Sequence, residues 1–258
     1  MRIALLGGTG DIGEGLALRW GHDTDHDIVI GSRDPEKARK AAERYESELD
    51  DRGVDAKLTG FENAMAADRA DVVVLAVPPY HVADTVDAVA DSLDDSDILV
   101  SPATGMQRDE NGFHYHPPDA GSVTAIVADA APDRVSVVGA FHNLAAGRLS
   151  DLSSDLGIDT LVIAEDSDAK ATVSGLAADI NGLRALDAGG LANAAEIESM
   201  TPLLINVAMN NDGLHDLGVR FDCFRLGVFL AVTIRGVRST PRGHDPWRRF
   251  SHVPSRTV

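Results

Sequence analysis

The sequence predicts an α/β fold: a Rossmann-type doubly wound sheet, mainly parallel, followed by a small C-terminal α+β domain. Three observations support this prediction. A glycine-rich turn at residues 7–13 directly follows the apolar run 2–6 and precedes a segment of helical character. The run 71–77 is almost continuously apolar, as expected of a parallel strand that is buried on both faces. Helical segments separate such runs, and this alternation builds a parallel sheet with right-handed crossovers.

The glycine-rich turn is the first functional signal in the chain. Glycines 8, 10 and 13 satisfy the spacing G-x-G-x-x-G between a strand and a helix. The first glycine allows the tight turn, the second lets the backbone approach phosphates, and the third lets the helix pack on the strand. The sequence therefore predicts a dinucleotide pyrophosphate site at the start of the helix. The alternative is a glycine-rich turn that only joins the two elements.

The other elements follow from periodicity and from turn residues. Strands are expected over 27–31, 56–59, 71–77, 97–101, 135–141, 159–164 and 184–187. Helices are expected over 11–20, 35–49, 61–68, 80–92, 119–130, 167–180 and 191–211, the last with a kink or break at Pro202. Residues 106–118 are expected to form a loop. Its His114 and His116 predict no metal site, because no carboxylate or cysteine cluster accompanies them.

The tip of the second strand indicates which dinucleotide is bound. An acidic residue at this tip would bond the ribose 2'-hydroxyl of NAD, but here Ser32 and Arg33 follow the strand, with Lys37 one helical turn later. A hydroxyl, a guanidinium and an ammonium suit a 2'-phosphate. We therefore predict NADP. The alternative is that Arg33 and Lys37 pair with neighbouring acidic residues on a solvated surface.

Two histidines follow strands whose ends meet at the same edge of the sheet. His81 lies in the loop after the strand 71–77, beside the expected dinucleotide, or it is a solvated loop residue. His142 follows the strand 135–141. No general acid or base is assigned from the sequence. His142 is the nearest candidate, and a structural or cofactor-orienting role is the alternative.

The charge of the chain excludes several partners. The net charge is −18, and 31 of the 41 acidic residues are aspartate, whereas four residues are lysine. Such a surface repels nucleic acid and anionic membranes, so neither is an expected partner. A strongly acidic, lysine-poor surface is also typical of proteins from salt-loving organisms, whose cytoplasm screens the repulsion.

The composition also indicates the domain boundaries and the cellular location of the protein. A Rossmann domain is expected over residues 1–142 and a small domain over 143–221, which closes a cleft at the strand ends. Residues 222–258 carry seven arginines and two acidic residues, whereas residues 1–221 carry 16 basic and 39 acidic residues, so we expect a basic tail that is disordered or appended. One cysteine, no apolar run long enough to span a bilayer and no signal peptide favour the cytoplasm.

In combination, these segments resemble the NADPH-dependent reductases of coenzyme F420, also called F420H2:NADP oxidoreductases. The similar segments are residues 1–13, the tip 31–33 with Lys37, the pair Ser101-Pro102, the segment 187–189 and the segment 198–203. The resemblance extends from residue 1 to about Phe221. It implies an intracellular homodimer that uses NADP and coenzyme F420, with the deazaflavin of F420 against the nicotinamide. With the acidic composition, it suggests a halophilic archaeon.

The resemblance also implies a set of cofactor-binding residues. The pyrophosphate would be held by Thr9, Gly10, Asp11 and Ile12, and the 2'-phosphate by Ser32, Arg33 and Lys37. Five residues would flank the dinucleotide: Val77, Pro78, His81, Thr104 and Ala146. The chain departs from the family pattern at Pro79 and at Leu144-Ala145, where bulkier groups or an apolar-proline pair are common.

The predicted reaction is a hydride transfer between the two bound cofactors. It needs aligned rings more than an acid-base constellation, which agrees with the absence of an assigned general acid. Two alternatives remain at this point. One is an NADP-dependent reductase of a small imine or carbonyl, such as a pyrroline-carboxylate-like substrate. The other is a redox-sensing NADP-binding protein without catalysis.

Overall fold

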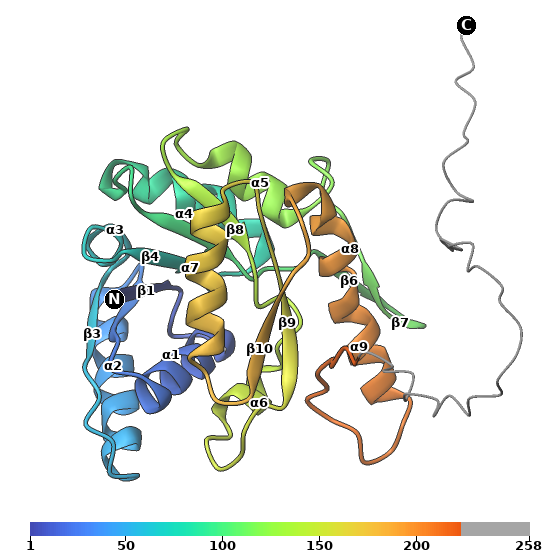
Figure 1. Ribbon diagram of the computed structural model, residues 1–258, viewed down its shortest axis with the longest axis horizontal. Coiled ribbons are helices and arrows are strands. Elements are labelled where there is room, and N and C mark those ends of the chain that lie inside the picture. The colour runs from blue at the N-terminus through green and yellow to red at the C-terminus, as the bar shows by residue number, and fades with distance from the viewer. Residues whose placement is uncertain (223–258) are drawn as a thin grey trace, which may run out of the picture. The chain divides into compact units, whose positions relative to one another are not determined.

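The computed structural model describes residues 1–222, and its core is one eight-stranded sheet (Figure 1). The strand order is β10-β9-β8-β5-β4-β1-β2-β3. All neighbouring strands are parallel except β8 and β9, which are antiparallel. The chain starts in the middle of the sheet, adds β2 and β3 on one side, and then adds β4, β5 and β8 on the other. The predicted doubly wound, mainly parallel α/β fold is therefore confirmed.

The strands of the sheet are β1 (Arg2–Leu6), β2 (Asp27–Ser32), β3 (Leu58–Glu62), β4 (Val72–Leu75), β5 (Ile98–Ser101), β8 (Ser136–Gly139), β9 (Ile158–Ala164) and β10 (Leu183–Asp187). The α-helices are α1 (Asp11–Asp23), α2 (Pro35–Asp50), α3 (Asn63–Ala67), α4 (Val82–Val89), α5 (Val123–Ala130), α6 (Ala146–Ser150), α7 (Ser167–Ala178), α8 (Ala194–Glu198) and α9 (Met200–Met209). Short 3-10 turns span Pro79–His81, Ala90–Ser92 and Leu191–Asn193.

Two apolar cores cover the two faces of the sheet. Alternate residues of β1 point to opposite faces, so Ile3 and Leu5 lie in one core and Ala4 and Leu6 in the other. The first core contains residues of α1, α2 and α7, and the second contains residues of α3, α4 and α5. Because both faces are buried, the central strands are apolar throughout, which is the pattern that predicted them.

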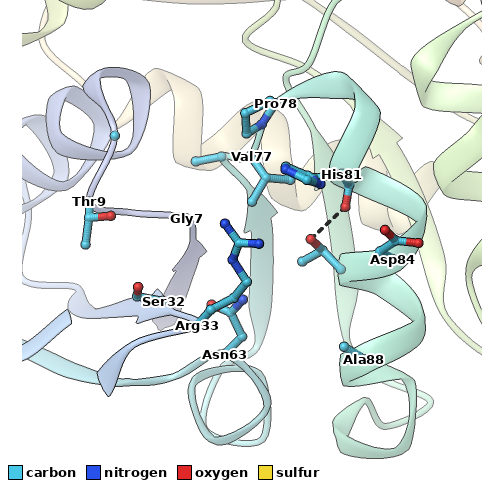
Figure 2. A pocket seen from close by; sticks show the side chains of 13 residues that line it. Gly7, Thr9, Ser32, Arg33, Asn63, Val77, Pro78, His81, Asp84 and Ala88 are labelled. Atoms are coloured by element: carbon cyan, nitrogen blue, oxygen red, sulfur yellow. Dashed lines mark hydrogen bonds between the residues drawn. The ribbon is translucent and has the colours of Figure 1, made fainter. Parts of the chain in front are cut away.

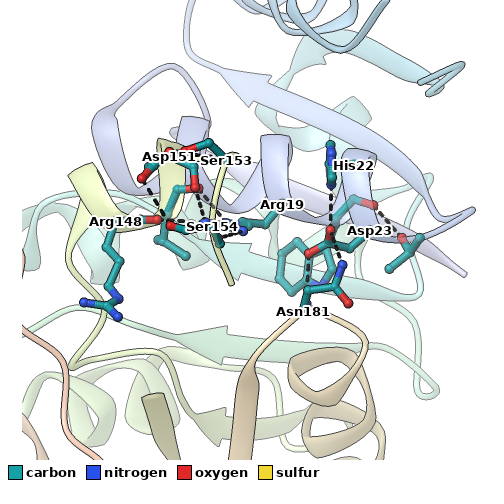
Figure 3. A network of polar contacts seen from close by, with 11 residues as sticks. Arg19, His22, Asp23, Arg148, Asp151, Ser153, Ser154 and Asn181 are labelled. Carbon is teal, nitrogen blue, oxygen red and sulfur yellow. Dashed lines mark hydrogen bonds and ion pairs between the residues drawn. The ribbon is translucent and has the colours of Figure 1, made fainter. Parts of the chain in front are cut away.

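A polar network ties α1 to α6 and to the segment that follows it (Figure 3). Arg19 is 2% exposed and donates hydrogen bonds to four backbone carbonyls, those of residues 148, 149, 151 and 154. One turn later, the Asp23 carboxylate accepts from the Asn181 backbone and side chain, both at 2.9 Å. The helix that begins at the glycine-rich turn is thus fixed to the second half of the chain.

Residues 106–118 do not form the predicted loop. They contain an antiparallel hairpin, β6 (Met106–Asp109) paired with β7 (Gly112–Tyr115). Asn206 of α9 holds the hairpin, since its amide accepts from the Phe113 N–H at 2.8 Å and donates to the Phe113 carbonyl at 2.6 Å. The strands are short and largely exposed, so they carry no apolar alternation, and the Asn-Gly turn was the available signal.

The predicted helical block 191–211 is divided before Pro202. The first helix, α8, ends at Glu198, and α9 starts at Met200, so Pro202 lies in the first turn of α9. In that turn its missing N–H costs no helical hydrogen bond. The break therefore comes at Ser199 rather than at the proline.

The sheet continues across the predicted domain boundary between residues 142 and 143. The later strands β9 and β10 extend the same sheet, and residues 1–221 form one compact unit. Assigning separate roles to 1–142 and 143–221 stays a prediction. The predicted basic tail, 222–258, lies outside the described residues apart from Asp222. No helix within residues 1–222 is long and apolar enough to cross a membrane.

Candidate functional site

The turn between β1 and α1 has the geometry of a phosphate-binding turn. Gly7 has a φ of +76°, and a Cβ on it would lie 2.6 Å from the Ala76 carbonyl oxygen. A Cβ on Gly13 would lie 2.5 Å from the Gly8 Cα, so the helix could not pack on the turn. By contrast, a Cβ on Gly10 would meet only the Gly7 oxygen, at 3.6 Å. The protein itself does not require glycine at residue 10, so the bare backbone there fits the close approach of a ligand.

The start of α1 is open to an anion. The backbone at its N-cap, Gly10, is extended, and no side chain caps the first amides. In α2, α5 and α7 the side chains of Asp34, Ser122 and Asp166 cap the corresponding amides. Free amides and the positive end of the helix dipole attract a phosphate. The structure thus fits the pyrophosphate predicted for residues 9–12.

A first cavity of about 370 Å³ lies beside this turn, at the carboxyl ends of β1, β2 and β4 (Figure 2). Seven of the predicted cofactor-binding residues line it: Thr9, Gly10, Ser32, Arg33, Val77, Pro78 and His81. Figure 2 shows Arg33 extending from the end of β2 into this space, toward Val77 and His81. Among the described lining residues, Arg33 is the one lysine or arginine. The cavity suits an adenosine with a 2'-phosphate.

The lining of the first cavity differs from the prediction at four residues. Lys37 is exposed in the first turn of α2 and does not line the cavity, so its contact with the 2'-phosphate stays a prediction. Asn63, Asp84 and Thr85 line the cavity without having been predicted. Asn63 directly follows β3, and the rule that ligands bind at the carboxyl ends of strands could have located it.

A second, larger cavity of about 760 Å³ lies on the other side of the turn. Five further predicted residues line it, namely Asp11, Ile12, Thr104, His142 and Ala146, and Val77 is common to both cavities. Its walls also include the positions where the chain departs from the family pattern, Pro79, Leu144 and Ala145. Sequence reasoning missed the wall formed by Leu204, Ile205 and Ala208 of α9 and by residues 214–217. An apolar cavity with few polar groups suits flat aromatic rings.

His142 is held in one tautomer by a chain of hydrogen bonds. The Glu198 carboxylate is buried, and its two oxygens accept hydrogen bonds from the backbone N–H groups of Val123 and Thr124. The Thr124 hydroxyl donates to Glu198 at 3.0 Å and lies 3.2 Å from His142 Nε2. Because that hydroxyl proton is used, Nε2 must carry the proton that it donates to Thr124. His142 Nδ1 is then an acceptor, and it has no partner among the described residues.

Burial also fixes the charge of His142. The side chain is 3% exposed, and this desolvation lowers its pKa to about 4. His142 is therefore neutral near pH 7 and cannot serve there as a protonated general acid. The structure favours the orienting role over the acid-base role. The hydroxyl of Thr201 adds to this, since it donates to the His142 carbonyl at 2.7 Å.

This lowered pKa predicts a pH dependence of stability. Between about pH 6.5 and pH 4, the histidine is protonated in the unfolded chain but stays neutral in the folded protein. The free energy of unfolding therefore decreases as the pH falls through this range. The loss amounts to roughly 3 kcal/mol at the acid end of this range. Urea unfolding of the wild type and of His142→Asn at several pH values across this range gives the free energy of unfolding as a function of pH. This function should have a smaller slope for the variant. Equal slopes would contradict the buried neutral state.

Asp11 is the one acidic group among the predicted pyrophosphate residues. It is exposed at the first position of α1 and caps no helical amide, which contradicts a capping role. Its charge should oppose an anion at this helix start. We expect Asp11→Asn to leave the affinity for NADPH unchanged or to raise it a few-fold, measured by titration calorimetry. Markedly weaker binding would mean that the carboxylate accepts a hydrogen bond from the ligand.

Comparison with known proteins now decides the family. A family model described as NADP oxidoreductase, coenzyme F420-dependent, matches residues 2–105. An F420-dependent NADP reductase from Methanocaldococcus jannaschii is 40% identical over 210 residues, which are 80% of this chain and 92% of that protein. The chain belongs to the F420-dependent NADP reductase family. Another reductase of this name, from Methanothermobacter marburgensis, is 37% identical over 85% of this chain and 97% of that protein.

Solved structures agree on the fold. A crystal structure from Arthrobacter sp. FB24, described as an F420-dependent NADP reductase, has a TM-score of 0.70 and 23% identity, covering 86% of this chain and all of that one. The arogenate dehydrogenase of Synechocystis has a TM-score of 0.53 at 16% identity, covering 74% of this chain and 61% of that one. The family predicted from the glycine-rich turn, the tip of β2 and the segment 198–203 is confirmed by the two reductases at 40% and 37% identity.

Proposed function

We propose that one NADP molecule lies across both cavities, with its adenosine in the first and its nicotinamide in the second. The activity is that of the family: a hydride passes between reduced coenzyme F420 and NADP. One observation carries the proposed binding mode. The two cavities lie on either side of the uncapped start of α1 and share Val77, so a pyrophosphate at that start would join two ligand halves.

The bound cofactors supply the chemistry, a direct hydride transfer between C5 of the deazaflavin and C4 of the nicotinamide. The chain supplies alignment and an apolar surface for the rings. Apolar residues of α9 and Ile12 line the second cavity. The neutral His142 and the hydroxyl of Thr104 offer polar contacts at fixed positions, since Thr104 lies 3.5 Å from Thr201 and Thr201 is bound to the His142 backbone.

Isotope transfer tests this assignment. NADPH that carries deuterium at the transferred C4 position should give F420 reduced with deuterium at C5, because direct transfer does not exchange with water. The same reaction in heavy water with unlabelled NADPH should leave C5 unlabelled. Label lost to solvent would contradict direct transfer. Oxidation of NADPH only with a small imine or carbonyl, or no oxidation at all, would favour the reductase or sensor alternatives.

We also propose a homodimer, and α9 supports it. This helix is apolar, yet Pro202 is its one buried residue within the described chain. Leu203 is 61% exposed and Val207 is 39% exposed, and they lie four residues apart on one side of the helix. Leu204, Ile205 and Ala208 of the same helix face the second cavity. An apolar stripe left open opposite a functional cavity suits a second copy of the chain.

The dimer prediction concerns Leu203 and Val207. The double substitution Leu203→Glu and Val207→Glu places two charges in the proposed interface, so we expect light scattering in molar KCl to change from a dimeric to a monomeric mass. Met65→Glu is the matched control, because Met65 is 46% exposed on α3 and lies outside the proposed interface. A monomeric wild type, or a dimeric double variant, would contradict this interface.

The acidic surface supports a halophilic, cytoplasmic protein. We propose this origin from the net charge of −18, the four lysines and the single cysteine. Repulsion among surface carboxylates is screened by molar salt and returns when salt is removed. Circular dichroism at decreasing KCl concentrations should therefore record loss of structure, and full stability without added salt would contradict the proposal.

A further inference from the structure

Asn63 occupies a distinctive position in the first cavity. It directly follows β3 and is the first residue of α3. The sheet register pairs Glu62 with Ser32, so Asn63 comes level with Arg33 at the same edge. Its side chain is buried, with 7% of the residue exposed, and it lines the cavity together with Ser32 and Arg33 (Figure 2).

The side-chain amide of Asn63 is unsatisfied. Its Oδ1 is buried and has no hydrogen-bond partner in residues 1–222, and its Nδ2 makes no hydrogen bond there either. Such an orphaned group costs the fold about 1–3 kcal/mol. A role as helix cap does not account for it, because the Glu62 side chain accepts from the Ala64 N–H and caps α3. Because Oδ1 has no exposed surface, the unpaired Nδ2 is the amide atom that can meet a ligand in the cavity.

The absence of a side chain at Gly31 leaves room for the Asn63 amide. A Cβ on Gly31 would lie 3.0 Å from Asn63 Oδ1, so a larger residue in β2 would crowd it. The carbonyl of the same Gly31 accepts from the N–H groups of Gly7 and Gly8, which anchors the glycine-rich turn. The Asn63 amide is therefore held against the backbone that positions the phosphates.

We propose that Asn63 is a specificity-determining residue for the 2'-phosphorylated ribose of NADP. This inference rests on the proposed function, which places that ribose in the first cavity. The amide NH2 donates to a 2'-phosphate oxygen, while Oδ1 stays buried against Gly31. A side-chain amide suits this contact, since its NH2 group is a donor that carries no charge. Arg33 supplies the charge, and Asn63 supplies a neutral contact of fixed geometry.

The test uses two fragments that differ in the 2'-phosphate alone, 2',5'-ADP and 5'-AMP, titrated by calorimetry into the full chain. For Asn63→Ala we expect the ratio of the two affinities to fall about tenfold, because a hydrogen bond to a charged group is lost with one fragment only. Asn63→Asp keeps the shape but adds a negative charge, so its ratio should fall further. Asn111→Ala, an exposed residue outside both cavities, should keep the wild-type ratio.

A second readout separates ligand binding from a structural role. Removing an unsatisfied buried amide should leave the melting temperature of the ligand-free protein unchanged or higher in Asn63→Ala. A lower melting temperature with an unchanged affinity ratio would overturn the proposal, as would equal weakening of both fragments. If the wild type binds neither fragment, the placement of NADP in the first cavity is wrong, and the inference falls with it.

Discussion

Replacing Arg33 with glutamate is expected to weaken NADPH binding by about a hundredfold or more and to change NADH binding little. Arg33 is the one cationic side chain among the described residues that line the first cavity. The substitution removes a planar donor pair from the 2'-phosphate and adds repulsion inside a partly enclosed site. NADH lacks that phosphate, so calorimetric titration of both dinucleotides separates the phosphate contact from damage to the fold.

Lys37→Glu is the matched control for Arg33→Glu. The change of charge is the same and both side chains are exposed, but Lys37 does not line the cavity, whereas Arg33 does. Screening in molar salt should limit the effect to a few-fold. A loss equal to that of Arg33→Glu would confirm the 2'-phosphate contact that the sequence predicts for Lys37. Arg33→Glu binding NADPH as tightly as the wild type would contradict the assigned orientation of the dinucleotide.

The second large effect is expected for Arg19→Met. Burial lowers the pKa of the Arg19 guanidinium, which nevertheless stays charged near pH 7. Its hydrogen bonds satisfy backbone carbonyls of residues 148–154, and methionine would fill part of the space while leaving those carbonyls unpaired (Figure 3). We expect the free energy of unfolding to fall by about 3–5 kcal/mol.

Urea unfolding in molar KCl measures this loss. Arg39→Met is the control, because Arg39 is exposed and pairs with Glu36 across one turn of α2. A surface pair of this kind is worth less than about 1 kcal/mol. The midpoint for Arg19→Met should therefore lie far below those of the wild type and of the control. A midpoint equal to that of the wild type would show that the network contributes no net stability.

The part of the site formed by single strand ends could be predicted from the sequence. Each parallel strand is a short apolar run, and the residues after it must come to one edge of the sheet, so Arg33 and Val77 were located from local order. Thr9 and Thr104 came from the family resemblance. The glycine-rich turn predicted a pyrophosphate site in the same way, and the structure shows that helix packing requires Gly13.

The rest depends on contacts between distant segments. The wall of the second cavity formed by Leu204 and Ile205 arises because α9 packs against the hairpin through Asn206, ninety-three residues away from Phe113. The antiparallel pairing of β8 with β9 is likewise a long-range choice. Asn63 was missed because its importance lies in an absent hydrogen bond, which no sequence pattern records.

The most direct test of the whole account is a spectroscopic one. Purified protein in molar KCl is mixed with NADPH and oxidised coenzyme F420, and the absorbance of the deazaflavin is followed. We predict that this absorbance decays with turnover and that Arg33→Glu slows the decay at NADPH concentrations that saturate the wild type. NADPH bound by the wild type with no change in the deazaflavin absorbance would contradict hydride transfer between the two cofactors.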